Sequence, residues 1–140
     1  MNRSTGDIYR DYNIAENNHD LAGTTRLLAS DLKVKVNGVA QLSSAADDEV
    51  AMKVLYDRYP DYRREILQII ESGEVAVVIW RMEGTPSSEY TGIPQLSVEG
   101  VSVVTGNGSV LTEAALYVDS TALGHALTLA HEEPRLSEDS

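Results

Sequence analysis

Apolar and polar residues alternate with different periods along this chain, and the changes of period divide it into helices and strands. Three N-terminal segments have apolar residues at helical spacing and are predicted to be helices over about 7–18, 21–29 and 43–59. Asp20 is well placed to cap the start of the second helix. Pro60 cannot continue the third helix and therefore ends it.

The remaining periodicity is typical of strands. Residues 32–36 alternate as LKVKV, and Asn37-Gly38 follows as a turn. In the longest apolar run, 74–83, one face ends in charged residues, so the opposite face with Trp80 and Met82 is predicted to point inward. Further strands are predicted over 62–70, 96–105 and 110–118, followed by a last helix from Asp119.

The order of these elements predicts an α+β domain, with helices first and then a curved, mostly antiparallel sheet that the N-terminal helices cap. A strongly curved sheet of this kind forms a cone-shaped α+β barrel, and such cones commonly hold an apolar pocket. The 140 residues suit a single domain, predicted to span 1–130. Residues 131–140 form a polar, acidic tail that is expected to be disordered.

The chain is strongly acidic, with 11 Lys and Arg against 22 Asp and Glu and a net charge of −11. Nucleic acid is therefore not expected as a partner, and a neutral or apolar small molecule fits better. With no cysteine and only three scattered histidines, no metal site is expected. No phosphate loop or dinucleotide motif occurs, so no cofactor is predicted. The lack of a signal-peptide core or a membrane-spanning run predicts a cytoplasmic protein with no membrane partner.

A set of short motifs occurs in a recognisable order. They are Glu16-Asn17-Asn18-His19-Asp20, Tyr59-Pro60-Asp61, Gly73-Glu74-Val75-Ala76-Val77 with Trp80, Gly92-Ile93-Pro94 and Tyr117-Val118-Asp119. Over roughly residues 9–130 the chain thereby resembles the SnoaL-like polyketide cyclases of the nuclear transport factor 2-like superfamily. The resemblance implies the cone fold, which hosts isomerases, dehydratases, epoxide hydrolases, cyclases and binding proteins.

The usual catalytic positions of this family are changed here. In its aldol-type cyclases the last long strand resembles E-H-W-D, with an inward His and Asp, whereas here Glu113 is followed by Ala114-Ala115-Leu116. Related ketosteroid isomerases carry a carboxylate near the end of the first strand, where the counterpart is Val36. The cavity is therefore expected to lack the family's usual acid–base residues. Asp47-Asp48-Glu49 is interpreted as negative charge favoured at a helix N-terminus.

Tyr12 is the predicted catalytic residue. It lies five residues before Asn17, the spacing of the oxyanion-hole tyrosine on the first helix of the ketosteroid isomerases, so its phenol would donate a hydrogen bond to a substrate carbonyl. His19, in the turn that ends this helix, is interpreted as structural. The predicted substrate-binding residues are Val34, Val36, Tyr56, Val78, Trp80, Met82, Ala114 and Leu116.

These features favour a cyclase of polyketide or related natural-product biosynthesis. It would bind a long neutral polyene or polyketide and close a ring by a pericyclic step such as a cycloaddition, which needs positioning but no proton transfer. The first alternative is an acid–base cyclase or isomerase that uses Glu113, Glu99 or Asp57 as its carboxylate. The second is a non-catalytic module that binds a small molecule.

A homodimer is also expected. Val75, Val77 and Ile79 form an apolar stripe on the outer face of the predicted central strand. Exposed stripes of this kind usually mark interfaces, and most soluble oligomers are symmetric assemblies of identical chains. The stripe therefore predicts that two copies pack through the outer face of the sheet.

Overall fold

The computed structural model describes residues 3–90 and 92–119 of the chain. This part contains helices α1 (Thr5–Asn17), α2 (Leu21–Arg26) and α3 (Ala45–Arg58), and strands β1 (Leu28–Val36), β2 (Val39–Leu42), β3 (Arg63–Ser72), β4 (Val75–Gly84), β5 (Leu96–Gly106) and β6 (Leu111–Val118). The helix and tail predicted beyond Asp119 lie outside the described residues.

Each helix begins at a side-chain cap. Ser4, Asp20 and Ser44 accept hydrogen bonds from backbone N–H groups of the first turns of α1, α2 and α3. The second helix is shorter than predicted, because it ends at Arg26 and Leu28 already pairs with Leu111 of β6. The prediction that 21–29 is helical was therefore wrong in its last turn, where strand pairing satisfies the backbone instead.

The strands form one mixed sheet in the order β2-β1-β6-β5-β4-β3. Among the strands of the described residues, only the β1–β6 pair is parallel, so the sheet is mostly antiparallel, as predicted. Asn37 and Gly38 turn the chain from β1 into β2 with φ values of 51° and 86°, which confirms the predicted turn. Strand β2 itself was not predicted, because Val39–Leu42 is short and largely exposed.

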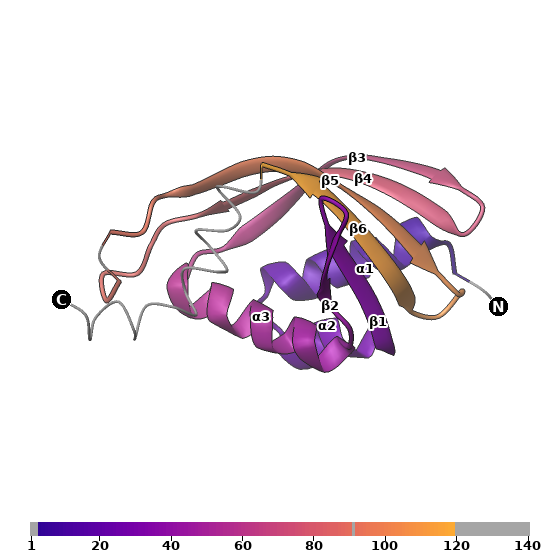
Figure 1. The fold of residues 1–140 in the computed structure, drawn as a ribbon, viewed down its shortest axis with the longest axis horizontal. Helices are drawn as coiled ribbons and strands as arrows, with labels where there is room; N and C mark the ends of the chain where they lie inside the picture. The colour runs from indigo at the N-terminus through magenta and orange to yellow at the C-terminus, as the bar shows by residue number, and fades with distance from the viewer. Residues whose placement is uncertain (1–2, 91, 120–140) are drawn as a thin grey trace.

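The sheet is curved and unclosed, and the three helices pack against its concave side (Figure 1). Strand β4, between β5 and the edge strand β3, shows strict alternation: Ala76, Val78, Trp80 and Met82 are buried, whereas the residues between them are half-buried. This confirms the predicted inward face, since a shift of one residue would reverse every side chain.

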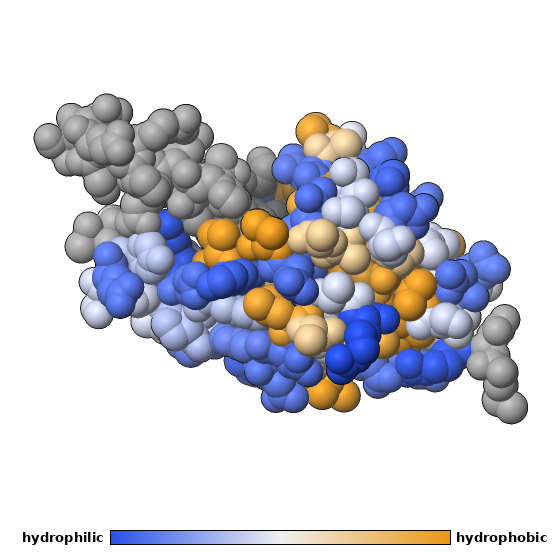
Figure 2. All heavy atoms as spheres, turned by 90° about the horizontal axis from the view of Figure 1, so that it is seen from below, coloured by the Kyte–Doolittle hydropathy of each residue, from blue (hydrophilic) through white to orange (hydrophobic). Residues whose placement is uncertain are grey.

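From the helical side, the surface shows apolar patches separated by hydrophilic residues (Figure 2). No helix within the described residues is long and apolar enough to cross a membrane. The buried apolar side chains lie between the helices and the sheet, and this space contains the candidate site.

Candidate functional site

A mostly apolar cavity of about 110 Å³ lies between α1, α3 and the concave face of the sheet. It is lined by Tyr9, Tyr12, Leu28, Leu32, Val34, Val36, Leu42, Asp48, Ala51, Met52, Leu55, Arg64, Met82, Ser102, Val104, Leu111, Ala114 and Leu116. The half-buried members, among them Val36, Leu42, Asp48 and Leu116, mark the end at which the cavity meets solvent.

Six of the nine predicted site residues are brought together in this lining: Tyr12, Val34, Val36, Met82, Ala114 and Leu116. The other three, Tyr56, Val78 and Trp80, are buried but do not line the cavity. Trp80 points inward as predicted, yet the guanidinium of Arg64 covers its ring, with the Cζ atom 4.6 Å from the ring centroid. Trp80 therefore supports the cavity floor from beneath.

Asp48 brings an ionisable carboxyl group into the apolar lining. It lies in the first turn of α3, and its Oδ2 accepts a hydrogen bond of 3.0 Å from the Tyr12 hydroxyl on α1. Burial raises the pKa of Asp48 from 3.8 to about 6, although the hydrogen bond from Tyr12 opposes this rise. Burial, followed by the nearby charge of Asp48, raises the pKa of Tyr12 well above 10. At neutral pH this pair combines a largely ionised carboxylate with a protonated phenol.

The cavity has no acid–base residue at the positions expected from the family, where Val36, Ala114 and Leu116 lie, but α3 supplies a carboxylate that was not predicted, Asp48. Its sequence neighbour Asp47 fits the helix-terminus interpretation, because it is exposed and accepts hydrogen bonds from Ser43. Asp48 instead shares a helix face with Met52 and Leu55, which lie four and seven residues further on and are buried. That spacing was the signal in the sequence that could have placed Asp48 inward.

The three carboxylates suspected from the sequence lie elsewhere. Asp57 and Glu99 are exposed and pair with Lys53 at 3.1 Å and Arg81 at 3.0 Å. Glu113 is also exposed, on the outer face of β6. None of them lines the cavity.

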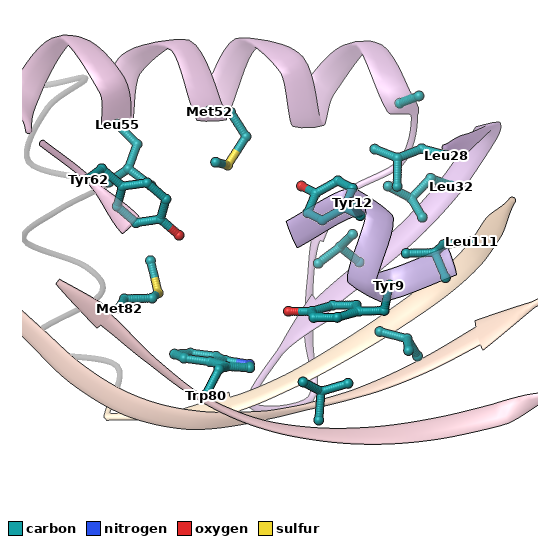
Figure 3. Packing of buried hydrophobic residues seen from close by; sticks show 14 of the residues in the cluster. Tyr9, Tyr12, Leu28, Leu32, Met52, Leu55, Tyr62, Trp80, Met82 and Leu111 are labelled. Carbon is teal, nitrogen blue, oxygen red and sulfur yellow. The ribbon is translucent and has the colours of Figure 1, made fainter. Parts of the chain in front are cut away.

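A buried polar cluster closes one side of the cavity. Arg64, on β3, donates from Nη1 to the hydroxyl of Tyr9 over 2.8 Å, and its Nε lies 3.5 Å from Oε2 of Glu16. Glu16 is fully buried and also accepts a 2.6 Å hydrogen bond from Tyr62. Burial is the largest single influence on the pKa of Arg64 and lowers it, but Glu16 and the surrounding tyrosines together outweigh burial, so the pKa is raised. The hydroxyl groups of Tyr9, Tyr12 and Tyr62 all point toward the middle of the core (Figure 3). This cluster was not predicted from the sequence.

His19 has a structural position, in agreement with its interpretation from the sequence. Its ring stacks on Tyr56 with centroids 4.0 Å apart, and Nε2 lies 2.8 Å from the carbonyl oxygen of Tyr62. Within residues 3–90 and 92–119, no group of three potential ligand side chains is arranged to hold a metal ion.

Comparisons with solved structures find the same fold at low sequence identity. An NTF2-like protein of unknown function from Cytophaga hutchinsonii is 10% identical, with a TM-score of 0.68 over 88% of this chain and 96% of that one. A candidate SnoaL-like polyketide cyclase from Shewanella denitrificans is 13% identical, with a TM-score of 0.72 over 86% and 93%. An epoxide hydrolase of M. tuberculosis, described as LEH-like, is 13% identical, with a TM-score of 0.70 over 95% and 96%.

Comparison with curated proteins finds no match. The model of the SnoaL-like domain, in contrast, matches residues 9–118, which is most of the chain and contains every residue that lines the cavity. The α+β fold with its curved, unclosed sheet agrees with this match. The chain therefore belongs to the SnoaL-like domain family, within the NTF2-like fold.

Proposed function

We propose that this protein is a cofactor-independent enzyme of the acid–base cyclase or isomerase type, acting on a neutral carbonyl compound with Asp48 as its base. The observation that carries the proposal is the Asp48 carboxyl group in a mostly apolar cavity, with its pKa raised to about 6. A general base works best when its pKa lies near the working pH. Perturbed carboxyl groups in clefts are also enriched at catalytic sites.

The proposed step is abstraction of a proton from the carbon next to the carbonyl group. The proton moves to an Asp48 oxygen, and the electron pair of the broken C–H bond moves through the carbon to the carbonyl oxygen, giving an enolate. Where a C=C bond is conjugated with the enolate, return of the proton from Asp48 to the far carbon of this dienolate restores the carbonyl group and completes an isomerisation. In a cyclase, the enolate carbon instead attacks a second carbonyl group of the substrate, the π electrons of that group move to its oxygen, and this oxygen takes the proton from Asp48. The new C–C bond closes a ring. Tyr12, which was predicted as a donor to the substrate, would instead hold and orient Asp48 through its hydrogen bond.

The size of the cavity limits what it encloses. Its volume of about 110 Å³ is below the roughly 300–1,000 Å³ typical of ligand pockets. For a polyketide-like substrate, the reactive end would enter past the half-buried residues at the mouth, between α3 and the strands β1, β2 and β6, and the remainder would extend outside the cavity.

Exchange of the α protons of cyclopentanone in D₂O, followed by NMR, tests the proposed step. We expect the wild-type protein to accelerate exchange, with a sigmoidal pH dependence centred near 6. Asp48→Asn should lower the rate by about 10²–10⁴, the usual contribution of a general base. Asp57→Asn, which changes an exposed aspartate on the same helix, should leave it unchanged. Equal rates for the two variants would refute the role of Asp48.

The pericyclic mechanism is the second candidate, and the large apolar majority of the lining favours it. Because a cycloaddition transfers no proton, its rate on a native substrate should not change with pH around 6. Tight binding without any turnover would instead favour the non-catalytic module.

The proposal includes a homodimer formed through the outer face of the sheet. On this face, Val77 pairs with Val103 and Ile79 pairs with Val101, so the apolar stripe extends from β4 onto β5. All four side chains are only half-buried in the single chain. Covering them in a symmetric contact would remove a continuous apolar surface from water.

A further inference from the structure

Two phenols line the cavity, and their hydroxyl groups have different partners. Tyr9 and Tyr12 are three residues apart on α1, with ring centroids separated by 6.0 Å. The Tyr12 hydroxyl donates its proton to Asp48. The Tyr9 oxygen instead accepts a hydrogen bond from Nη1 of Arg64. A phenol has only one proton, so Tyr12 is already engaged by the candidate base.

The proton of Tyr9 is available to a ligand. Among the described residues, no acceptor is found for it, although Tyr9 is buried and lines the cavity. Burial raises the pKa of Tyr9 above 10, but Arg64 and the neighbouring Ser102, whose oxygen accepts the indole hydrogen of Trp80, favour negative charge on the phenol oxygen and oppose this rise. Donors directed at the phenol oxygen polarise its O–H group toward a ligand acceptor.

We propose that Tyr9, polarised by Arg64, is the hydrogen-bond donor that binds the substrate's carbonyl oxygen, opposite Asp48. This inference rests on the proposed function and specifies its substrate class. The Tyr9 hydroxyl would stabilise the negative charge that develops on oxygen while Asp48 removes the proton from carbon. Tyr9 thus takes the role that was predicted from the sequence for Tyr12, from a position about one turn nearer the N-terminus of the same helix.

The charges around the cavity select a neutral substrate. The positive charge of Arg64 is balanced by Glu16, which lies 3.5 Å away and is fully buried. An ionised Asp48 adds one uncompensated negative charge to the lining. A carboxylate ligand would therefore meet net repulsion in a low-dielectric site, whereas a ketone or aldehyde would not.

Binding of cyclopentanone tests the inference without turnover. We expect the carbonyl stretch of the bound ketone to shift to lower frequency in the infrared spectrum of the wild-type complex. Methylenecyclopentane, which has nearly the same shape but no oxygen, should bind about five- to tenfold more weakly, as expected for one lost hydrogen bond. Cyclobutanecarboxylate should not bind detectably at pH 7.5.

Two variants identify the donor. Tyr9→Phe should abolish the frequency shift and weaken cyclopentanone to the affinity of methylenecyclopentane. Tyr62→Phe is the matched control, because it removes a buried phenol that donates to Glu16 and does not line the cavity. It should keep the shift. A shift that persists in folded Tyr9→Phe would overturn the inference.

The wild-type measurements decide the question even if Tyr9→Phe does not fold. Equal affinity for the ketone and the alkene, or an unshifted carbonyl stretch, would overturn carbonyl binding by Tyr9. The proposed function is judged separately by the proton-exchange assay with Asp48→Asn. A shifted stretch without exchange that depends on Asp48 would leave the carbonyl site standing and refute only the proposed reaction.

Discussion

The hydroxyl of Tyr12 donates a 3.0 Å hydrogen bond to Oδ2 of Asp48, joining the middle of α1 to the first turn of α3 at the cavity wall. The bond favours the ionised carboxylate, whereas burial favours the neutral acid, and burial has the larger effect. Asp48 therefore has a pKa of about 6, close to the pH at which a base must exchange protons with its substrate.

The opposing effects on Asp48 predict the result of Tyr12→Phe. Removing the phenol hydroxyl keeps the ring and its packing but deletes the hydrogen bond to the carboxylate, so the pKa of Asp48 should rise further above 6. We expect an upward shift of up to about one pH unit, equivalent to about 1.4 kcal/mol. A ¹³C NMR titration of the carboxyl group measures it. A downward shift would contradict the assigned donor.

The raised pKa of Asp48 also predicts a pH-dependent stability. Between pH 3.8 and about 6 the folded protein holds a proton that the unfolded chain has released, so the free energy of unfolding falls as pH rises through this window. Above it the effect is constant. Asp48→Asn has no such proton. As the pH rises from 4 to 7, its free energy of unfolding should therefore increase by on the order of 3 kcal/mol relative to that of the wild type. Urea denaturation across this range checks it, with Asp57→Asn as control. A pH-independent difference would contradict burial of an ionisable Asp48.

Local patterns in the sequence predict much of the fold, because its main helices and strands repeat at the periods of those structures. Strand β4 is the clearest case, since alternation alone identifies the Trp80 and Met82 face. The burial of Arg64 could not be predicted in this way. It depends on the pairing of Arg64 with Met82 across β3 and β4, which places both side chains on the concave face. That register is a property of tertiary structure and not of the local sequence.

The candidate site was likewise predictable only where it depends on local sequence. Tyr12 was identified because the helical spacing of nearby residues shows which face of the helix it lies on. The apolar lining was identified because strand alternation is also a local pattern. Asp48 was misinterpreted because an acidic residue in the first turn of a helix has a sufficient electrostatic explanation without any cavity. Its partner Tyr12 is 36 residues away in sequence, and only the packing of α1 against α3 brings the two together.

Loss of the buried charge of Glu16 is expected to lower the free energy of unfolding by a large amount. Glu16→Gln would leave the buried guanidinium of Arg64 without its counter-charge and would weaken the acceptor for Tyr62. Breaking one partner of a buried pair typically costs about 3–5 kcal/mol. Chemical denaturation should show a loss of this size. The exposed pair Lys53–Asp57 is the control, and Asp57→Asn should cost less than about 1 kcal/mol. Similar losses for both variants would contradict the difference in burial.

Gly100 is expected to be sensitive because of its neighbour Trp80. A Cβ atom at position 100 would lie 2.6 Å from the Cη2 atom of the indole ring, so Gly100→Ala must displace Trp80 and, above it, Arg64. Overpacking of this kind typically costs about 1–3 kcal/mol. Thermal and urea denaturation measure the loss, with the exposed Ser97→Ala on the same strand as the control. Wild-type stability of Gly100→Ala would show that the ring moves freely.

The proposed dimer predicts the behaviour of a charge placed on the outer face of β4. Wild-type protein should sediment as a dimer at micromolar concentration, and Val77→Lys should sediment as a monomer with an unchanged circular dichroism spectrum, because the lysine would be buried unpaired at the contact. Ile14→Lys provides the matched control, since Ile14 is 60% exposed on α1 and the helices cover the opposite side of the sheet. It should remain dimeric. A monomeric wild type would refute the interface, and a dimeric Val77→Lys variant would move it away from this stripe.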